Sequence, residues 1–222
     1  MEKEKTNTVS PRNAILVMVA TFFLVLFSEA VFLLTLGQGP ALVLTEFVVL
    51  LVPLSYMLLK HVDIRSYIGL DVKPRFILFG LASAGLLFLV DVVVSGLFTA
   101  LFGVSRAVEQ SNATVTSLSS STGGLIYVVL ALSMAGVCEE FAFRGFLQNT
   151  INRRYSFIPA VVVSSVAFGI FHFDPQLVYT LSAMIAGLTL GYVYHRWNSY
   201  VVSAVAHSTV NLVVLALLLH GL

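Results

Sequence analysis

Residues 136–145 of this chain, GVCEEFAFRG, place two adjacent glutamates and an arginine inside an otherwise apolar run. Glu140 and Arg144 are four residues apart, so on a helix they share a face and can form an ion pair that orients the helix or a substrate. Glu139 points about 100° away from Glu140 on such a helix. It therefore has no charged partner in this stretch and is a candidate for chemistry.

Two later apolar runs carry side chains that could complete a reaction site. His172 ends the run AFGIFHF, with Phe168 one helical turn before it. His207 lies in VAHSTVNL, and Asn211 follows four residues later on the same helical face. A single histidine in a helix is usually a packed, hydrogen-bonded residue, but the combination with a carboxylate and an amide is what a buried polar reaction site requires.

The chemistry expected from this set is hydrolysis. A carboxylate and a neutral imidazole can take a proton from one water, and we expect Glu139 and His172 to form this general base. An imidazole and an amide one turn apart can donate to the oxyanion of a tetrahedral intermediate, and we expect His207 and Asn211 to fill this role.

Two other mechanisms use some of the same residues. Glu139, His172 and His207 could instead bind zinc, since histidine and carboxylate are proper ligands, although the chain has no H-E-x-x-H pair. Cys138 could act as a nucleophile, but the neighbouring Glu139 opposes formation of its thiolate.

The composition indicates that the elements positioning these residues are membrane helices. Of 222 residues, 58% are hydrophobic and 10% are charged, whereas a soluble domain carries about 25% charged residues. The net charge of +1 gives no basic surface for nucleic acid. We therefore expect an all-α polytopic bundle that contacts membrane lipid and no nucleic acid.

A membrane helix needs about 20 predominantly apolar residues. The sequence predicts about seven such spans, within a range of six to eight, and the first is expected to stay as an anchor because it is too long for a signal peptide. The predicted spans are 14–36, 40–60, 76–102, 124–147, 158–173, 176–195 and 199–220. We expect one integral-membrane unit with two parts: residues 1–123, with N-terminal spans and a polar outer loop, and residues 124–222, the catalytic core.

The distribution of lysine and arginine predicts the orientation. With the N-terminus inside, ten of the twelve basic residues fall on the cytoplasmic side, Arg106 falls outside, and Arg144 lies within a span. The N-terminus and the loops at 60–75, 153–157 and 195–198 are therefore expected in the cytoplasm.

The motifs EEFAFR, FGIFH and HSTVN resemble the EExxxR, FxxxH and HxxxN motifs of the CAAX protease and bacteriocin-processing family, which includes type II CAAX prenyl endopeptidases and Abi-type proteins. The resemblance covers roughly residues 124–215. It implies a helical intramembrane endopeptidase without a cofactor, which uses a glutamate-activated water, the first glutamate and first histidine as the base, and a histidine–asparagine oxyanion site. It also implies cleavage that faces the cytosol and a peptide or lipidated protein substrate, prenylated in the CAAX enzymes.

Two other functional classes compete with this interpretation. A membrane immunity or scaffold protein of the same family could keep the charged core for structure or ligand binding. A transporter could use intramembrane acids as an ion path. The complete set of glutamate, two histidines and asparagine favours the protease, because a scaffold would need only the Glu140–Arg144 pair.

Overall fold

Polar and glycine residues at the ends of the apolar runs determine where the helices begin and end. Ser10 caps the first helix, since its hydroxyl accepts a hydrogen bond from the amide of Asn13 at 3.3 Å. Gly37, with a φ of 85°, separates the first helix from the second. Asp63 caps a short helix in the next linker, where its carboxylate accepts from the amide of Ser66.

The computed structural model describes residues 9–221. Within that range the regular secondary structure is helical and contains no strand, which confirms the all-α prediction. Lys3 and Lys5, two of the twelve basic residues, lie outside the described residues. The elements are α1 (Pro11–Leu36), α2 (Gln38–Leu59), α3 (Ile64–Ile68), α4 (Pro74–Phe102), α5 (Arg106–Ser119), α6 (Thr122–Glu140), the π-helix η1 (Phe141–Gln148), α7 (Asn149–Arg154), α8 (Phe157–Phe171), α9 (Val178–Trp197) and α10 (Tyr200–Leu219).

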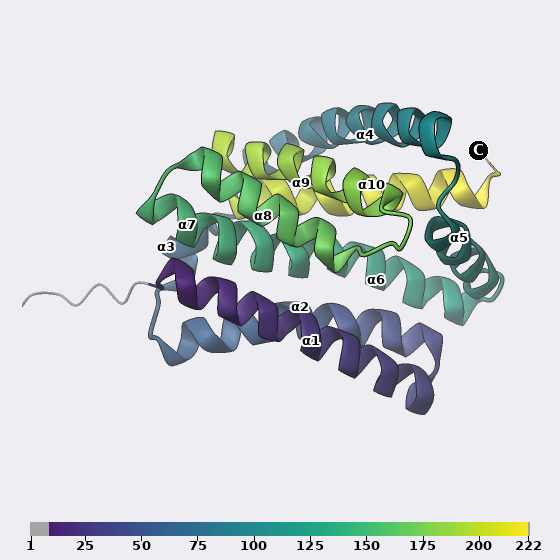
Figure 1. Cartoon of the computed structure of the whole chain (residues 1–222), viewed down its shortest axis with the longest axis horizontal. Coiled ribbons are helices and arrows are strands. Elements are labelled where there is room, and N and C mark those ends of the chain that lie inside the picture. Colours follow the sequence, from purple (N-terminus) through teal and green to yellow (C-terminus); the bar gives the residue numbers. More distant parts are fainter. Residues whose placement is uncertain (1–8, 222) are drawn as a thin grey trace, which may run out of the picture.

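Each predicted span corresponds to a helix that runs along the length of the molecule (Figure 1). These helices are α1, α2, α4, the continuous run α6–η1–α7, α8, α9 and α10. The start of α1 lies at the same end as α3 and the α7–α8 connection, and the C-terminus lies at the opposite end (Figure 1). A chain that crosses a membrane an odd number of times must start its first helix and finish its last helix on opposite sides, and the helices are arranged in this way.

Five of these helical runs are long and apolar enough to cross a membrane by length and composition: α1, α2, α4, Thr122–Arg154 and α10. Their number makes the chain a polytopic integral membrane protein. α8 is a shorter apolar helix of 15 residues, which spans only about 22 Å. α9 is long enough, but its last turn carries His195 and Arg196, and it is less apolar than the five.

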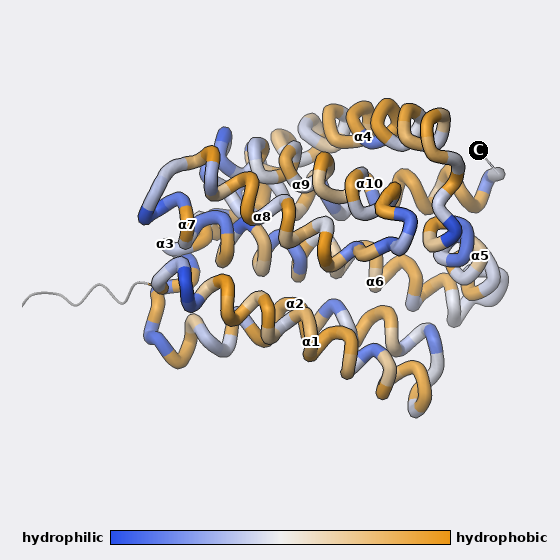
Figure 2. Tube along the Cα trace, viewed as in Figure 1, coloured by the Kyte–Doolittle hydropathy of each residue, from blue (hydrophilic) through white to orange (hydrophobic). Residues whose placement is uncertain are grey.

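The helix α6 lies at the centre of the packing. It lies between α2 and α10, while α1 packs on α2, α4 packs on α10 and α9, and α8 packs on α9 and η1. Apolar residues line α1, α2 and α4, whereas polar residues gather in α5 and at the connections (Figure 2). One buried core contains residues of α1 and α2 together with η1, so the two expected parts pack as one unit. The boundary at residue 123 stays a proposal.

The polar outer loop expected between Gly103 and Gly124 contains a helix, α5. Ser105 caps α5 by accepting a hydrogen bond from the amide of Val108 at 3.4 Å. Glu109 lies in the first turn, where its negative charge interacts favourably with the helix dipole. The segment is rich in serine and threonine, which favour turns, so its composition predicted a loop and not a helix. α5 packs against α6 and has no fully buried residue.

Three basic loops meet at one end of the molecule. The guanidinium of Arg153 donates to the carbonyl of Tyr67 at 3.1 Å and lies 4.3 Å from the centre of its ring. The amide of Tyr200 donates to the carbonyl of Gly69 at 3.3 Å. The loops at 60–75, 153–157 and 195–198 therefore lie at the same end of the molecule.

Candidate active site

The two helices that carry the glutamates and the second histidine cross in close contact. A methyl group at Gly136 would overlap Ser208 of α10, so only glycine allows this approach. The hydroxyl of Ser208 donates to the carbonyl of Ser133 on α6 at 2.8 Å. These contacts fix the position of α10 along α6, and His207, next to Ser208, reaches the glutamates.

The expected ion pair forms at the end of α6. Nη1 of Arg144 lies 2.9 Å from Oε1 of Glu140, and both side chains are 0% exposed. The same carboxylate oxygen lies 3.0 Å from Nδ1 of His207. Buried charges require this kind of pairing and hydrogen bonding. The pair therefore also anchors His207, a contact between residues 67 positions apart that the sequence analysis did not foresee.

A π-helix begins directly after Glu140. In η1 the amide of Asn149 donates to the carbonyl of Arg144, five residues earlier, instead of four as in an α-helix. π-Helical segments inside α-helices are rare and occur frequently at functional sites. Gly145 lies inside η1, and a methyl group there would come within 3.0 Å of Ile68 on α3. The wide turn and the glycine together bring α3 against the helix that carries the glutamates.

Polar side chains of η1 bond to the backbone of α9. Nη2 of Arg144 donates to the carbonyl of Gly187 at 3.2 Å, and Nε2 of Gln148 donates to the carbonyl of Gly191 at 2.9 Å. A methyl group at Gly191 would lie 2.6 Å from Oε1 of Gln148. Gln148 was not among the predicted site residues, although the sequence contains a signal for it: Arg144 and Gln148 are four residues apart, and so are Gly187 and Gly191.

Glu139 faces both histidines. Its Oε1 lies 3.9 Å from Nε2 of His172, and its Oε2 lies 3.8 Å from Nε2 of His207. Its side chain is 12% exposed, and Oε2 is buried without a hydrogen-bond partner in the protein. The structure thus brings Glu139, His172 and His207 together, and the carboxylate contacts neither ring directly.

The tautomer of His172 follows from its neighbour. Nδ1 of His172 lies 2.8 Å from the carbonyl oxygen of Phe168. A carbonyl only accepts hydrogen bonds, so Nδ1 carries the proton. In the neutral ring, Nε2 is then an acceptor, and it is this nitrogen that faces Glu139. Two acceptors 3.9 Å apart are suited to receive the two hydrogens of one water molecule.

The same reasoning applies to the second histidine. Nδ1 of His207 faces the Glu140 carboxylate, which accepts, so Nδ1 carries a proton. Nε2, on the other side of the ring, faces Glu139. Nε2 can donate a hydrogen bond only when the ring is an imidazolium.

The ring of Phe168 lies close to both histidines and to the arginine. The centre of its ring lies 4.5 Å from that of His172 and 5.9 Å from that of His207. Cζ of Arg144 lies 4.4 Å from the ring centre, at cation–π distance. Phe168 therefore contacts both histidines and the guanidinium, in keeping with its expected supporting role.

Asn211 contacts the backbone of α6. Its Nδ2 donates to the carbonyl of Leu132 at 3.2 Å, one turn beyond the bond from Ser208. An amide nitrogen carries two hydrogens, so one remains for another acceptor. The structure thus gives Asn211 a part in docking α10 on α6, in addition to the oxyanion role that the sequence predicts.

The geometry differs for the two alternative mechanisms, a zinc site and a Cys138 nucleophile. Within residues 9–221, no group of three histidine, cysteine, aspartate or glutamate side chains is arranged to hold a metal ion. Glu139, His172 and His207, the ligands of the alternative zinc mechanism, do lie together, with separations of 3.8 and 3.9 Å between the glutamate oxygens and the ring nitrogens. Cys138 is 0% exposed, which leaves its thiol no access to a substrate.

Comparisons with known proteins match the motif-bearing part of the chain. Residues 121–213 match the family model described as type II CAAX prenyl endopeptidase Rce1-like. The chain is also similar to the protein named "Putative membrane peptidase YdiL" of Bacillus subtilis (strain 168), with 29% identity over 128 residues, covering 53% of this chain and 52% of that protein. The chain thus spans about half the length of the curated relative that it matches. No solved structure gives a significant match. The family resemblance drawn from the three motifs is confirmed for residues 121–213.

Proposed function

Because residues 121–213 match the Rce1-like family, we propose that this chain is a membrane-embedded endopeptidase that hydrolyses a peptide bond near the C-terminus of a membrane-associated substrate. The observation that carries the proposal is the placement of Glu139. Its two carboxylate oxygens face Nε2 of His172 and Nε2 of His207 at 3.9 and 3.8 Å. A structural ion pair would use direct contact, as Glu140 and Arg144 do.

In the first step, Glu139 and His172 bind one water between Oε1 and Nε2. The water oxygen attacks the carbonyl carbon of the scissile bond, and the water proton passes to this base pair. Since both groups accept, the water donates to both and keeps a lone pair for the attack. Arg144 is paired with Glu140, and the proposal assigns His207, in its imidazolium form, as the donor to the developing negative charge.

In the second step, the tetrahedral oxyanion accepts a hydrogen bond from Nε2 of His207 and from the second hydrogen of the Asn211 amide. The carbonyl re-forms as the carbon–nitrogen bond breaks. The leaving amine takes the proton that Glu139 and His172 received from the water. The products are a carboxylic acid and an amine, and the remaining proton of the attacking water passes from the acid to the amine, which leaves a carboxylate and an ammonium group. The site thereby returns to its starting protonation state.

The proposal uses no metal ion and takes a peptide or a lipidated protein, such as a prenylated one, as the substrate. The direct test is cleavage of a farnesylated CAAX peptide by the purified chain in detergent, followed by mass spectrometry. Cleavage that survives a chelator and is absent in Glu139→Gln supports the proposed mechanism. Cleavage that the chelator abolishes and zinc restores favours the zinc mechanism, whereas no cleavage of farnesylated or unmodified peptide contradicts the peptidase proposal.

We also propose that the basic end of the molecule lies in the cytoplasm and that the site serves cytosolic substrates. This follows from the positive-inside rule for short loops. Ser66 on α3 and Thr116 on α5 are both exposed and belong to opposite sides in this proposal. With Cys138 replaced, an impermeant thiol reagent outside intact cells should label Thr116→Cys and not Ser66→Cys. The reverse labelling would overturn the orientation.

A further inference from the structure

The connection between α8 and α9 carries a buried carboxylate that the proposed chemistry does not use. Asp174 is 1% exposed. Non-helical backbone inside a membrane protein has to find hydrogen-bond partners within the protein. The Asp174 carboxylate supplies them, since it accepts from the amide of Gln176 at 3.0 Å and from the amide of Tyr179 at 3.1 Å. It thereby ties the connection to the first turn of α9.

A buried hydroxyl links this network to His172. Thr180 is 4% exposed, and its hydroxyl accepts from the amide of Asp174 at 2.8 Å and donates to the carbonyl of His172 at 3.2 Å. The Thr180 hydroxyl thus accepts one hydrogen bond and donates one within the protein. It joins the backbone of the first histidine to the same turn of α9 that Asp174 caps.

The network continues to the corner between α4 and α5. The hydroxyl of Ser105, which is 3% exposed, donates to Asp174 Oδ2 at 2.9 Å. The amide of Arg106 donates to Oε1 of Gln176 at 2.7 Å. Ser105 is also the cap of α5. The capping residue of α5 is therefore linked to the His172 backbone through Asp174 and Thr180.

His172 needs such support because it is not part of a helix. α8 ends at Phe171, and His172 has a φ of −102° and a ψ of 40°, outside the helical range. The bond from Nδ1 to the Phe168 carbonyl orients the ring, but the backbone of His172 depends on the connection that leads from α8 to α9. A shift of about 1 Å in a reacting group can lower a rate by up to about 10²-fold.

Resting on the proposed function, we propose that Asp174 and Thr180 are positioning residues for His172, and that Ser105 couples the α4–α5 corner to them. None of the three is assigned contact with a substrate. A displacement of α5 at the outer side, by a partner or by the bilayer, would then change the rate of cleavage at the site.

Threonine variants on α9 test the proposal in the full chain. Thr180→Val keeps the shape and removes the hydroxyl, and it should lower kcat about 10-fold with little change in KM. Thr180→Ser restores the hydroxyl and should recover most of the rate. Thr189→Val is the matched control, because the Thr189 hydroxyl donates only to the Ile185 carbonyl of its own helix. Ser105→Ala should lower kcat several-fold by loosening Asp174.

Equal kcat values for Thr180→Val and Thr189→Val would overturn the positioning role while leaving the peptidase proposal intact. A rise in KM without loss of kcat would overturn it as well, because it would place Thr180 in substrate binding. An unrescued Thr180→Ser would show that side-chain volume matters and the hydroxyl does not, which also contradicts the proposal.

A second measurement does not depend on catalysis. Hydrogen exchange of the full chain should show protected amides at Asp174, Gln176 and Tyr179, and Ser105→Ala should increase their exchange while leaving the amides of α10 unchanged. If wild-type protein cleaves no peptide, the proposed function fails and this exchange result still decides whether the network exists. Unchanged exchange in Ser105→Ala would overturn the coupling to α5.

Discussion

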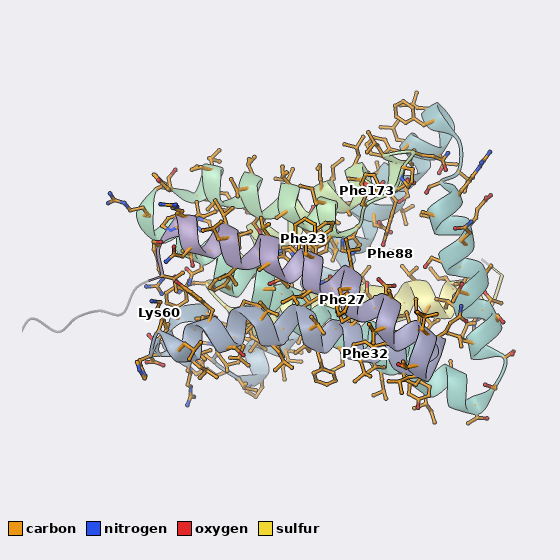
Figure 3. The ribbon with its side chains drawn as sticks, turned by 60° about the horizontal axis from the view of Figure 1, so that its bottom comes forward. Phe23, Phe27, Phe32, Lys60, Phe88 and Phe173 are labelled. Atoms are coloured by element: carbon orange, nitrogen blue, oxygen red, sulfur yellow. The ribbon has the colours of Figure 1, made fainter. Side chains whose placement is uncertain are left out.

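The helix α1 and the helix run α6–η1–α7 contain the same kinds of apolar residue and use them differently. In the apolar 18-residue stretch of α1 that could cross a membrane, 11% of the residues are buried within the protein. In the corresponding stretch of Thr122–Arg154, 44% are buried. Phe23 and Phe27 lie along α1 and are 64% and 70% exposed, as the surface that meets lipid (Figure 3). The run through η1 instead buries a complete ion pair.

This difference shows that mean hydropathy identifies a span but does not say what it contacts. α1 carries one acid, Glu29, on an exposed position, and α6 carries Glu139 beside two histidines. The chain surrounds a polar centre with helices whose outer faces are apolar. Identical substitutions on the two kinds of helix should therefore have very different effects.

The largest contrast is expected between two glutamates. Glu139→Gln should lower turnover by more than about 10³-fold, because glutamine cannot accept the water proton. Glu29→Gln makes the same change on the exposed face of α1 and should leave turnover unchanged. Cleavage of the farnesylated peptide measures both. Near-normal turnover of Glu139→Gln would show that another group is the base. A loss of turnover in Glu29→Gln would show that an exposed acid of α1 also matters for cleavage, which contradicts the contrast between the two helices.

The next contrast is between a buried and an exposed ion pair. Arg144→Met leaves the carboxylate of Glu140 buried without its cation, and it should lower the free energy of unfolding by about 3–5 kcal/mol. Lys73→Met removes the partner of Asp71 in a pair whose side chains are 51% and 41% exposed, and it should cost less than about 1 kcal/mol. Denaturant unfolding in a fixed detergent measures both. Adding Glu140→Gln to Arg144→Met should recover part of the loss, and no recovery would contradict the charge-based explanation.

The second histidine helix allows a test of catalysis against docking. His207→Ala and Asn211→Ala should each lower kcat by about 10²–10³-fold, and the double variant should lose less than the product of the two if they serve one oxyanion. Ser208→Ala is the control, because it removes another α10–α6 hydrogen bond without touching the proposed oxyanion site. If Asn211→Ala costs no more than Ser208→Ala, Asn211 serves only to dock the helix.

The helices and the residues that meet at the site could be predicted because both depend on local patterns. Apolar runs of about 20 residues indicate spans, and the four-residue spacing of Glu140 and Arg144 indicates a pair that the structure contains. The convergence of Glu139, His172 and His207 followed from their chemical types and from a motif resemblance. Their roles in cleavage stay predictions that the variants of these residues test.

Other features could not be predicted because they depend on contacts between distant segments. Nothing near His207 in the sequence indicates that its Nδ1 faces Glu140 on another helix. The π turn of η1 and the polar links of Asp174 likewise depend on neighbours that only the folded chain provides. α5 was missed for a different reason, because its serines and threonines favour turns unless a cap and a packing surface select the helix.

A smaller contrast is expected between two glycines. Gly136→Ala places a methyl group against Ser208 and should cost about 1–3 kcal/mol in unfolding free energy, as overpacking does. Gly85 lies in α4, where an added methyl group would have no neighbouring atom within 4 Å, so Gly85→Ala should be neutral or stabilising by up to about 1 kcal/mol. Unfolding in the same detergent measures the pair. Equal effects of the two substitutions would contradict the close crossing of α6 and α10.

The smallest effect is a pH dependence at Asp174, in the connection between α8 and α9. Burial raises the pKa of this carboxyl, but hydrogen bonds from the amides of Tyr179 and Gln176 and from the hydroxyl of Ser105 lower it by more, so the pKa lies below its usual value. A group with a lowered pKa stabilises the fold above its unfolded pKa of about 3.9, and this contribution is lost as the pH falls through the folded pKa.

Asp174→Asn should therefore have a lower Tm than the wild type at pH 6, and the difference should narrow as the pH falls below about 4, because the wild-type carboxyl then becomes neutral as well. Asp71, an acid of the α3–α4 linker whose side chain is 41% exposed, provides the control, since Asp71→Asn should change Tm little at either pH. A Tm difference for Asp174→Asn that stays constant from about pH 6 to about pH 3 would show that shape, and not charge, matters at this position. Such a result would place Asp174 with the packed residues of the bundle and separate it from the charged centre around Glu140.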